Sequence, residues 1–574
     1  MKTSSPQQKW WSRTVIVMLI AIPFFAFGQS LWQGYAPIDD LFVVARNLAT
    51  RGPTWEHLKT AFTTFDPELY IPATLLSFQL NYLVSGLSPW SYHLVNVLLH
   101  GMNAVLLFLI LRKVTGAPRA SLFAAALFAV HPINTEAVVW ITARKDLLST
   151  FFALASTLAF LKQTRRGLLL SIVLFLFALL AKVSVAPLPL VFPLLLSLQG
   201  KKWSRNTFFS IVPFFLLSSA FVSLALLGKE RIVQTSHGME TLLLAPRSVF
   251  FLLGKFFAPQ NLSPLYEVTD PIALTNPWIV ASLIGFLGIV GIFCFLYKIS
   301  LRPTPYALSL FIFLILFSPA LLTFRKAGTV FLASDRYIYL PMLGLLLCLA
   351  LFMKGIGERW TLPKPLIAGT GGFLIALLCL LSIKQTAFWN SADALFTHAL
   401  NVTPRSVAAR TALAQIKLNA DLPEEAFAIL KEGLKQGDDA RLHLMAGTVY
   451  AHTGQVTDAL EQFNKVKQME PTNADAYFSI ASIEEQTGSA DSALTNYRTA
   501  VQLDASDVPA LVGIGRILAA KGDLAGAEQA FRSALAWNQN SMEAHRGLAP
   551  VLAKTGRTDE AEVHLLLGLE LAKP

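Results

Sequence analysis

The sequence predicts an all-α protein in two parts: a polytopic bundle of membrane helices over residues 1–394 and a helical solenoid over residues 395–574. Of its 574 residues, 54% are hydrophobic and only 14% are charged, whereas an average soluble domain has about 25% charged residues. Several uncharged apolar runs reach the roughly 17 to 25 residues that cross a bilayer as a helix. The second part is instead rich in alanine and charged helix formers, and a motif recurs in it every 34 residues.

Eleven apolar runs make up the predicted bundle. Lys2, Lys9 and Arg13 precede the first run, so the positive-inside rule places the N-terminus in the cytoplasm. The loops that then lie inside are basic, and 13 of the 14 acidic residues before position 395 lie outside. We therefore expect the chemistry on the outer face. The runs lie near residues 14–32, 91–111, 119–132, 143–161, 167–182, 184–199, 207–228, 274–297, 305–324, 337–354 and 365–384.

Two further apolar segments, 72–86 and 241–258, are short or interrupted by charge, and we expect them to lie as helices at the outer interface. The first belongs to an outer loop that covers residues 33–90. If 241–258 crossed the membrane, every later basic loop would lie outside, so the charge bias argues against it. Because the basic residues cluster at the ends of apolar runs, the pI of about 9.4 indicates membrane orientation and no nucleic-acid partner.

The recurring motif in residues 395–574 is typical of tetratricopeptide repeats. A glycine permits a tight turn between two helices, and an aromatic residue fills the gap to the next repeat. We expect four regular repeats and one degenerate unit before them, in an acidic solenoid on the outer side. The glycines are Gly454, Gly488, Gly522 and Gly556, and the aromatic residues are Phe463, Tyr497 and Phe531.

Asp39 and Asp40 follow the first span within the string GYAPIDDLFVVARN. Paired carboxylates beside a membrane are costly to desolvate, which favours a functional role. Either can act as a general base that takes the proton of an attacking hydroxyl. The alternative is structural, a solvated pair or an N-cap for the stretch LFVVARN.

His93, Asn96 and His100 lie three and four residues apart at the outer end of a predicted span, so they share one helix face. Hydrogen bonds between helices explain this face without any ligand. A metal site would need carboxylates from Asp39 or Asp40, and we predict no metal site there. No cofactor is required by a motif, although a divalent cation is left open.

The string AVHPINTEAVVWITARKDLLS carries the densest group of polar residues near the outer face. The chain leaves the membrane at His131, and Glu136, Arg144, Lys145 and Asp146 follow before it returns. As a structural alternative, these residues form an ion-pair cluster that caps the next helix.

Cations also lie at the outer ends of later spans, among them Lys182 and Arg336, the latter in ASDRYIYLPMLG. Snorkelling of long side chains to the interface explains them without a ligand. Together with Arg144 and Lys145 they instead predict a site for a lipid phosphate, because arginine presents a fork that matches phosphate oxygens and lysine a mobile point charge.

The outer-loop Asp39-Asp40 pair, the strings YHLVNVLLH, AVHPINTEAVVWITARKDLLS and DRYIYLP, and the C-terminal repeats resemble the transmembrane and tetratricopeptide repeat-containing O-mannosyltransferases and their bacterial relatives. That family belongs to the GT-C superfamily of integral-membrane glycosyltransferases. The resemblance covers nearly the whole chain, and the motif at 131–149 is its most specific part.

The resemblance implies inverting transfer of mannose or a similar hexose from a polyprenyl-phosphate-linked donor to Ser or Thr of a protein acceptor, at the periplasmic or lumenal face. It also implies an acidic base in the first outer loop, a position that Asp39 and Asp40 match. Members often carry Lys-Glu at the outer end of the fifth span, whereas here Val183 follows Lys182, so a role for that acid does not transfer. The remaining active-site candidates are the phosphate ligands Arg144, Lys145, Lys182 and Arg336, and also His93, His100, His131, Glu136 and Asp146.

The resulting hypothesis is an integral-membrane glycosyltransferase of a bacterial inner membrane, with the N-terminus cytoplasmic and the repeats periplasmic, or lumenal in a eukaryote. The solenoid holds the protein or peptide acceptor or a partner. No nucleotide is expected, because the chain has no Rossmann glycine-rich turn and no P-loop. The alternative is a non-catalytic membrane-anchored repeat scaffold, for which the outer acids are dispensable. A transporter is disfavoured, because the ionisable groups lie at span ends.

Overall fold

The computed structural model describes residues 6–36, 38–65, 69–201, 204–229, 238–300, 304–326, 329–359 and 363–572. The chain divides into two compact units. The first comprises residues 1–44 and 49–403, and the second comprises residues 45–48 and 404–574. The helix α16 (Ala392–Val402), which crosses the predicted boundary at residue 394, belongs to the first unit.

The first unit is a bundle of long helices. In its described residues, the single sheet is a two-stranded antiparallel pair, β1 (Arg325–Lys326) and β2 (Thr329–Val330). The helices before α16 are α1 (Pro6–Phe27), α2 (Trp55–Thr63), α3 (Pro72–Ser85), α4 (Trp90–Thr115), α5 (Pro118–Val130), α6 (Thr135–Val139), α7 (Arg144–Phe160), α8 (Arg165–Ala181), α9 (Val191–Leu198), α10 (Arg205–Lys229), α11 (Gly238–Phe257), α12 (Pro277–Ser300), α13 (Pro305–Phe317), α14 (Met342–Arg359) and α15 (Lys364–Ala387).

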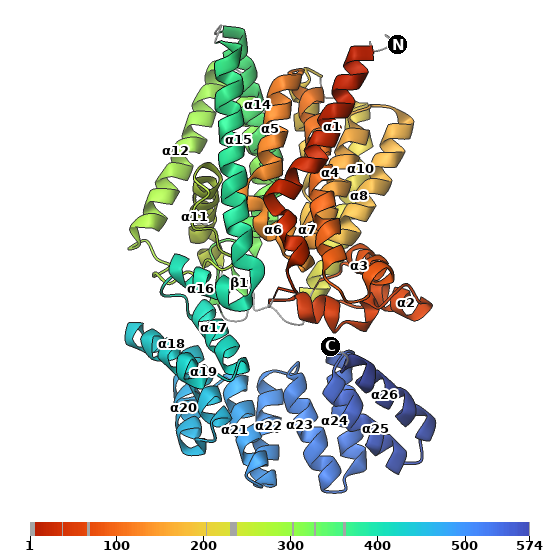
Figure 1. The fold of residues 1–574 in the computed structure, drawn as a ribbon, viewed down its shortest axis with the longest axis vertical. Helices are drawn as coiled ribbons and strands as arrows, with labels where there is room; N and C mark the ends of the chain where they lie inside the picture. Colours follow the sequence, from red (N-terminus) through yellow and green to blue (C-terminus); the bar gives the residue numbers. More distant parts are fainter. Residues whose placement is uncertain are drawn as a thin grey trace. The chain divides into compact units, whose positions relative to one another are not determined.

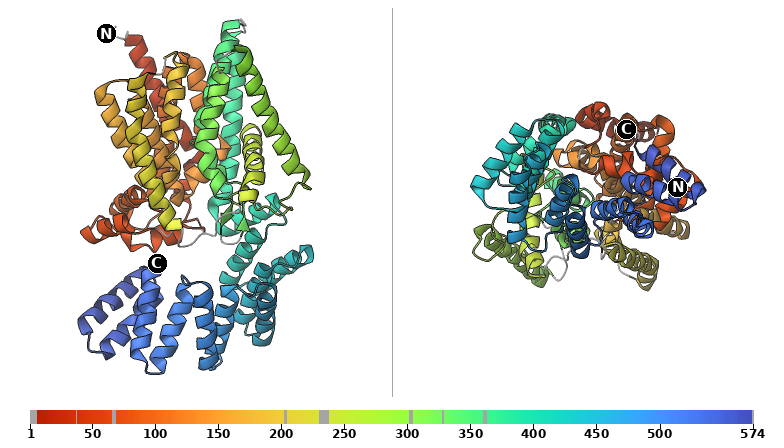
Figure 2. Two further views of the ribbon diagram at one scale, coloured as in Figure 1. Left: turned by 180° about the vertical axis from the view of Figure 1, so that it is seen from behind. Right: turned by 90° about the horizontal axis from the view of Figure 1, so that it is seen from below.

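Helix α4 is central to this unit, since it packs against α1, α5 and α7. Helix α1 approaches α4 very closely at Gly101, where an added Cβ would lie 2.9 Å from the Cα of Ile20. Only a residue without a side chain allows this approach. The helices α2, α3 and α16 and the strand β1 gather at the end of the bundle opposite the start of α1 (Figures 1 and 2). Most of the candidate site residues lie at that end, in the segments that connect the long helices.

Five helices in the described residues are long and apolar enough to cross a membrane: Arg13–Trp32, Trp90–Thr115, Arg205–Gly228, Pro305–Leu322 and Pro365–Asn390. A sixth is present if the bent pair Pro118–Val130 and Pro132–Val139 is one span. These helices support a membrane protein, but they do not confirm the predicted count of eleven.

The predicted span 184–199 differs from the structure. Two 3-10 turns, Val183–Val185 and Leu188–Leu190, precede the eight-residue helix α9. Pro187 and Pro189 lie in this segment, and proline removes a backbone donor and disfavours a helical residue before it. The segment is therefore apolar but does not form one continuous helix.

In its described residues, the second unit contains five helical hairpins. Each first helix begins at a side chain that accepts a hydrogen bond from the first turn, such as Asn473 from Ala476 and Ser541 from Ala544. The helices are α17 (Val407–Asn419), α18 (Pro423–Gln436), α19 (Ala440–His452), α20 (Val456–Met469), α21 (Ala474–Gln486), α22 (Ala490–Leu503), α23 (Val508–Ala520), α24 (Leu524–Trp537), α25 (Met542–Lys554) and α26 (Thr558–Leu571).

The repeated glycines and aromatic residues have the roles that their spacing predicts. The four turn glycines have φ between 74° and 86°, which is the left-handed region. Phe531 on α24 fills the contact to the following hairpin, because a Cβ added to Gly547 would lie 2.4 Å from its ring. Small residues thus let consecutive repeats stack around buried aromatic rings.

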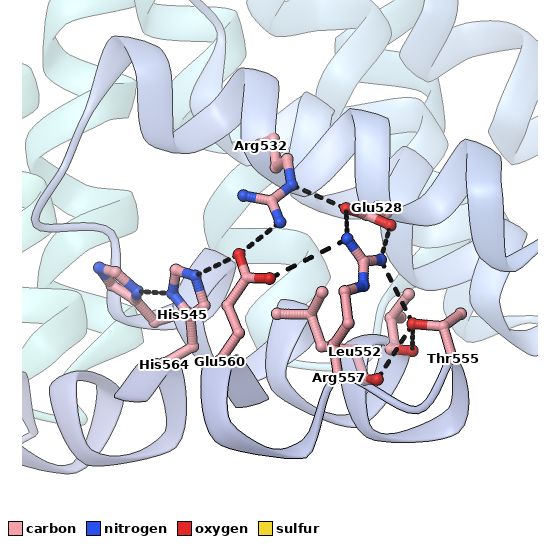
Figure 3. Close-up of polar contacts among 9 residues, drawn as sticks. Glu528, Arg532, His545, Leu552, Thr555, Arg557, Glu560 and His564 are labelled. Carbon is pink, nitrogen blue, oxygen red and sulfur yellow. Dashed lines mark hydrogen bonds and ion pairs between the residues drawn. The ribbon is translucent and has the colours of Figure 1, made fainter. Parts of the chain in front are cut away.

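The last two hairpins are joined by a polar network (Figure 3). Arg532 on α24 donates to Glu528 at 2.8 Å and also pairs with Glu560 on α26. Arg557 bridges back to Glu528. These partners lower the pKa of Glu528 to about 2.

Candidate functional site

The segment between α5 and α7 is folded into short turns. The 3-10 turn Pro132–Asn134, helix α6 and the 3-10 turn Ile141–Ala143 follow one another before α7 begins at Arg144. His131 caps the first turn: its Nδ1 accepts from the amide of Ile133, and its Nε2 contacts the carbonyl of Phe256 at 3.0 Å. In this structure both ring nitrogens of His131 are used to hold the fold.

Arg144 is fully buried and lies at the centre of a hydrogen-bond network. Its Nε donates to Asn96 Oδ1 at 2.8 Å, its Nη2 donates to the carbonyl of Tyr92 at 2.7 Å, and its Nη1 donates to Asn81. The guanidinium also lies 4.6 Å from the ring centroid of Phe78. Arg144 thus ties α3, α4 and α7 together, and all three of its nitrogens have protein partners.

Asp39 and Asp40 have different surroundings. Asp40 is fully buried, with Oδ2 accepting from the amide of Ala36 and Oδ1 from the amide of Thr142, both at 2.8 Å. Burial raises the pKa of Asp40 to about 6, although these amides lower it. Asp39 is half-buried, and within the described residues its carboxylate makes no hydrogen bond or ion pair.

Two cations, Lys145 and Arg336, interact with Asp39, and a third, Lys182, lies beside Lys145. Lys182 Nζ contacts Asp146 Oδ1 at 2.5 Å, and Arg336 pairs with Glu136. Lys145 interacts electrostatically with Lys182, Arg336, Asp39 and Asp146. Asp39 also contributes to the raised pKa of Arg336: burial lowers that pKa, but Glu136, Tyr337, Asp146 and Asp39 raise it by more.

Glu136 is the residue that fixes Arg336. Both of its carboxylate oxygens accept from the Ser334 hydroxyl, at 2.7 and 2.9 Å, and one accepts from the backbone amide of Arg336 at 3.0 Å. Residues almost 200 positions apart are thereby held together on α6 and the 3-10 turn Asp335–Ile338.

The histidines of α4 serve the packing of the bundle. His100 Nδ1 contacts the Tyr339 hydroxyl at 2.7 Å and its Nε2 contacts the carbonyl of Ala129 at 3.2 Å. His93 Nε2 lies 3.3 Å from the carbonyl of Gly34. In the part of the chain that the structure describes, no group of three or more His, Cys, Asp or Glu side chains is arranged to hold a metal ion.

Sequence reasoning missed three residues around this site, namely Asp335, Tyr266 and Trp140. Asp335 is buried, and its Oδ1 accepts from the hydroxyl of Tyr266 at 2.9 Å. Burial and the nearby charge of Glu136 raise the pKa of Asp335 well above its usual range. The third is Trp140, whose ring lies beneath the Arg336 guanidinium. Asp335 and Trp140 lie inside the two strings already singled out, whereas no local signal identifies Tyr266.

The fold and the site define an all-α membrane protein with a tetratricopeptide-repeat array. A family described as Protein kinase G tetratricopeptide repeat matches residues 378–565. Over much of its length the chain is similar to Protein O-mannosyl-transferase TMTC3 of Homo sapiens, with 26% identity over 79% of this chain and 55% of that protein. It is also 27% identical to human Protein O-mannosyl-transferase TMTC4, over 70% of this chain and 63% of that protein.

A shorter stretch is more similar still: Protein O-mannosyl-transferase tmtc2 of Xenopus laevis is 48% identical over 103 residues. Among solved structures, the crystal structure of MamA is 21% identical over 28% of this chain and 94% of that chain, with a TM-score of 0.24. The homologues of the chain are thus TMTC protein O-mannosyl-transferases, which confirms the family resemblance of the motifs. The chain spans 55% to 63% of the length of the TMTC3 and TMTC4 relatives.

Proposed function

We propose that the protein transfers a sugar, mannose or a similar hexose, from a polyprenyl-phosphate carrier to a serine or threonine hydroxyl of a protein acceptor. The names of its relatives support an O-mannosyl-transferase. The carrier, the GT-C class and the inverting course are proposed from the family resemblance, and the residue roles are proposed from the site.

The observation that carries this proposal is the state of Lys145. It is only 8% exposed, and within the described residues its ammonium has no ion pair and no hydrogen bond. A buried charge without a partner is strongly unfavourable, so such a group is normally paired. Lys182 and Arg336 lie beside it, and each is already paired with a carboxylate, that of Asp146 and that of Glu136. A phosphate that binds there gives the Lys145 ammonium a direct partner.

The two acids then divide the chemistry. Asp39, whose carboxylate has no hydrogen-bonding partner, takes the proton of the acceptor hydroxyl as its oxygen attacks the anomeric carbon. The bond from that carbon to the phosphate oxygen breaks, and Lys145, Lys182 and Arg336 stabilise the negative charge that develops on the leaving phosphate. Asp40 holds the loop, because both of its oxygens accept backbone amides.

The surroundings of Lys182 favour a lipid-linked donor over a soluble one. A small cavity beside Lys182 is lined by apolar and aromatic residues from the loop before α3, from the 3-10 turn Val183–Val185 and from α10, namely Leu69, Tyr70, Ile71, Val183, Phe221 and Ala225. A cation at the edge of an apolar recess suits the phosphate of an amphiphile.

The competing function is a membrane-anchored repeat scaffold without catalysis. The repeats alone are compatible with it, since such solenoids bind partners along extended surfaces. It gives no reason for an unpaired buried lysine next to an unpaired carboxylate. The glycosyltransferase explains both.

The test is transfer of mannose from a purified polyprenyl-phosphate mannose to a serine-containing peptide by the full chain. Asp39→Asn should lower the rate about 10²-fold or more, because the base is lost while its shape is kept. Glu56→Gln, which removes an exposed acid of the same outer loop, is the matched control and should keep the wild-type rate. Wild-type turnover by Asp39→Asn would disprove the assignment, and absence of transfer by the wild type would favour the scaffold.

A further inference from the structure

Trp140 is held rigidly between the candidate cations. Its backbone carbonyl accepts from Asn96 Nδ2 at 3.2 Å, and Asn96 is itself fixed by Arg144. Two residues further on, the amide of Thr142 donates to Asp40. These contacts anchor the backbone from which the indole ring projects.

Two cations lie over the ring of Trp140. The Arg336 guanidinium lies 4.5 Å from the ring centroid and Lys145 Nζ lies 5.8 Å from it. Both distances are within the range of cation–π attraction. For Lys145, whose ammonium makes no hydrogen bond or ion pair among the described residues, the negative ring face adds to the longer-range attraction of Asp39 and Asp146. The ring thus keeps two like charges close together before any anion arrives.

The indole N–H of Trp140 has no hydrogen-bond acceptor among the described residues. Trp140 is 2% exposed, and its Nε1 has no hydrogen-bond partner. An indole N–H can only donate, and a buried donor without an acceptor is rare in folded proteins. A ligand that carries a hydrogen-bond acceptor would therefore satisfy the N–H of Trp140.

We propose that the indole N–H of Trp140 donates to the phosphate of the lipid-linked ligand, while its ring positions Lys145 and Arg336 for the same phosphate. This inference rests on the proposed function and adds a neutral donor to its phosphate site. The arriving anion has to displace a side chain to reach the buried nitrogen. Lys145 can move, because no hydrogen bond or ion pair holds it, and it carries a flexible stem.

Trp389 provides a matched comparison. It is 5% exposed, its Nε1 also has no partner, and its ring centroid lies 6.3 Å from that of Trp140. No lysine or arginine lies over the Trp389 ring in the described part of the chain. If the loss of any buried indole N–H without a partner weakens binding, replacing either tryptophan by phenylalanine should do so. If the N–H of Trp140 contacts the phosphate, only the replacement of Trp140 should weaken binding.

The experiment measures binding of a polyprenyl monophosphate and of the uncharged polyprenol to the full chain in phosphatidylcholine nanodiscs. Trp140→Phe keeps an aromatic face and loses the N–H, so we expect its affinity for the monophosphate to fall about tenfold, with little change for the alcohol. Trp140→Leu also loses the face, and we expect a further loss of about threefold or more. Trp389→Phe should bind the monophosphate as the wild type does.

Two results would overturn the inference: wild-type affinity of Trp140→Phe for the monophosphate, or an equal loss for monophosphate and alcohol, which indicates a purely structural role. An unchanged thermal unfolding midpoint of Trp140→Phe serves to separate binding from folding. If the wild type itself does not distinguish the monophosphate from the alcohol, the phosphate site of the proposed function fails instead. The two failures are therefore distinguishable.

Discussion

Asp39 and Asp40 are neighbours in the chain with opposite surroundings. The carboxylate of Asp40 is enclosed and each of its oxygens accepts a backbone amide, whereas that of Asp39 has no hydrogen bond or ion pair within the described residues. An enclosed carboxylate is out of reach of an acceptor hydroxyl, whatever its basicity. Replacing the two acids should therefore have different consequences: loss of chemistry at Asp39 and loss of loop order at Asp40.

The raised pKa of Asp40 leads to a prediction about pH. Below about 6 the carboxyl takes up a proton, and the protonated oxygen no longer accepts its amide. We expect the transfer rate to rise with pH through a midpoint near 6, as measured by initial rates between pH 5 and 8. In Asp40→Asn the residual rate should be low and should lack this step. A wild-type profile that is flat across this range would contradict the role of Asp40.

The same pKa has the opposite effect on global stability. The folded-state pKa of about 6 lies above the usual value near 3.8, so only the folded protein binds a proton between these values. The contribution of Asp40 to the free energy of unfolding therefore falls by ~3 kcal/mol as pH rises from about 4 to 6, and is constant above. A loss of activity in acid is then not explained by global unfolding through Asp40.

At the scale of elements, the last hairpin carries a titratable contact between α25 and α26. His545 Nδ1 and His564 Nδ1 lie 2.8 Å apart (Figure 3). His545 Nε2 lies 2.9 Å from the carbonyl of Gln539. Because a carbonyl only accepts, His545 carries its proton on Nε2 and accepts from His564 at Nδ1. Glu560 lies 4.0 Å from His564 Nε2. A proton on His545 Nδ1 would break the link between the two rings.

We predict that this hairpin loosens in acid. Burial lowers the pKa of both histidines, so their contribution to stability is present above about 6.5 and is lost as pH falls below it. Hydrogen-exchange protection of α25 and α26 in the full chain should fall between pH 7 and 5. The hairpin α21–α22 has no histidine and is the internal control. Equal changes in both hairpins, or an unchanged response in His545→Phe, would rule out the histidine pair as the cause.

At the scale of the whole molecule, the distribution of charge predicts the topology. Residues 1–394 carry 31 Lys and Arg against 14 Asp and Glu, and residues 395–574 carry 16 against 22. With basic loops inside, the N-terminus is cytoplasmic and the repeats are on the outer side. A reporter that is active only in the periplasm, fused after Pro574, should be active. If only a cytoplasmic reporter were active there, the outer location of the site would be wrong as well.

The repeats give a second prediction at this scale. A solenoid surface can hold an extended chain and raise the local concentration of a tethered acceptor. Deleting residues 405–574 should therefore weaken modification of full-length protein acceptors much more than transfer to a short peptide at saturating concentration. An equal loss with both acceptors would mean that the repeats support the fold of the membrane unit.

The sequence by itself determined the helical class, the 34-residue repeat and the strings that contain the candidate site. These are local properties: apolar runs, periodic glycines and charge at span ends depend on residues close in the chain. These local properties do not ensure a continuous helix, since the apolar run at 184–199 is broken by 3-10 turns.

Only the tertiary structure decided which candidate does what. Asp40 differs from Asp39 because an amide 102 positions away, that of Thr142, lies against it. Arg144 became a buried anchor through Asn81, Tyr92 and Asn96, and Lys145 makes no ion pair with any residue that the structure describes. A sequence records which groups can ionise or donate, but the partners that satisfy them come from distant segments. The physical role of a polar side chain is therefore fixed only when the chain is folded.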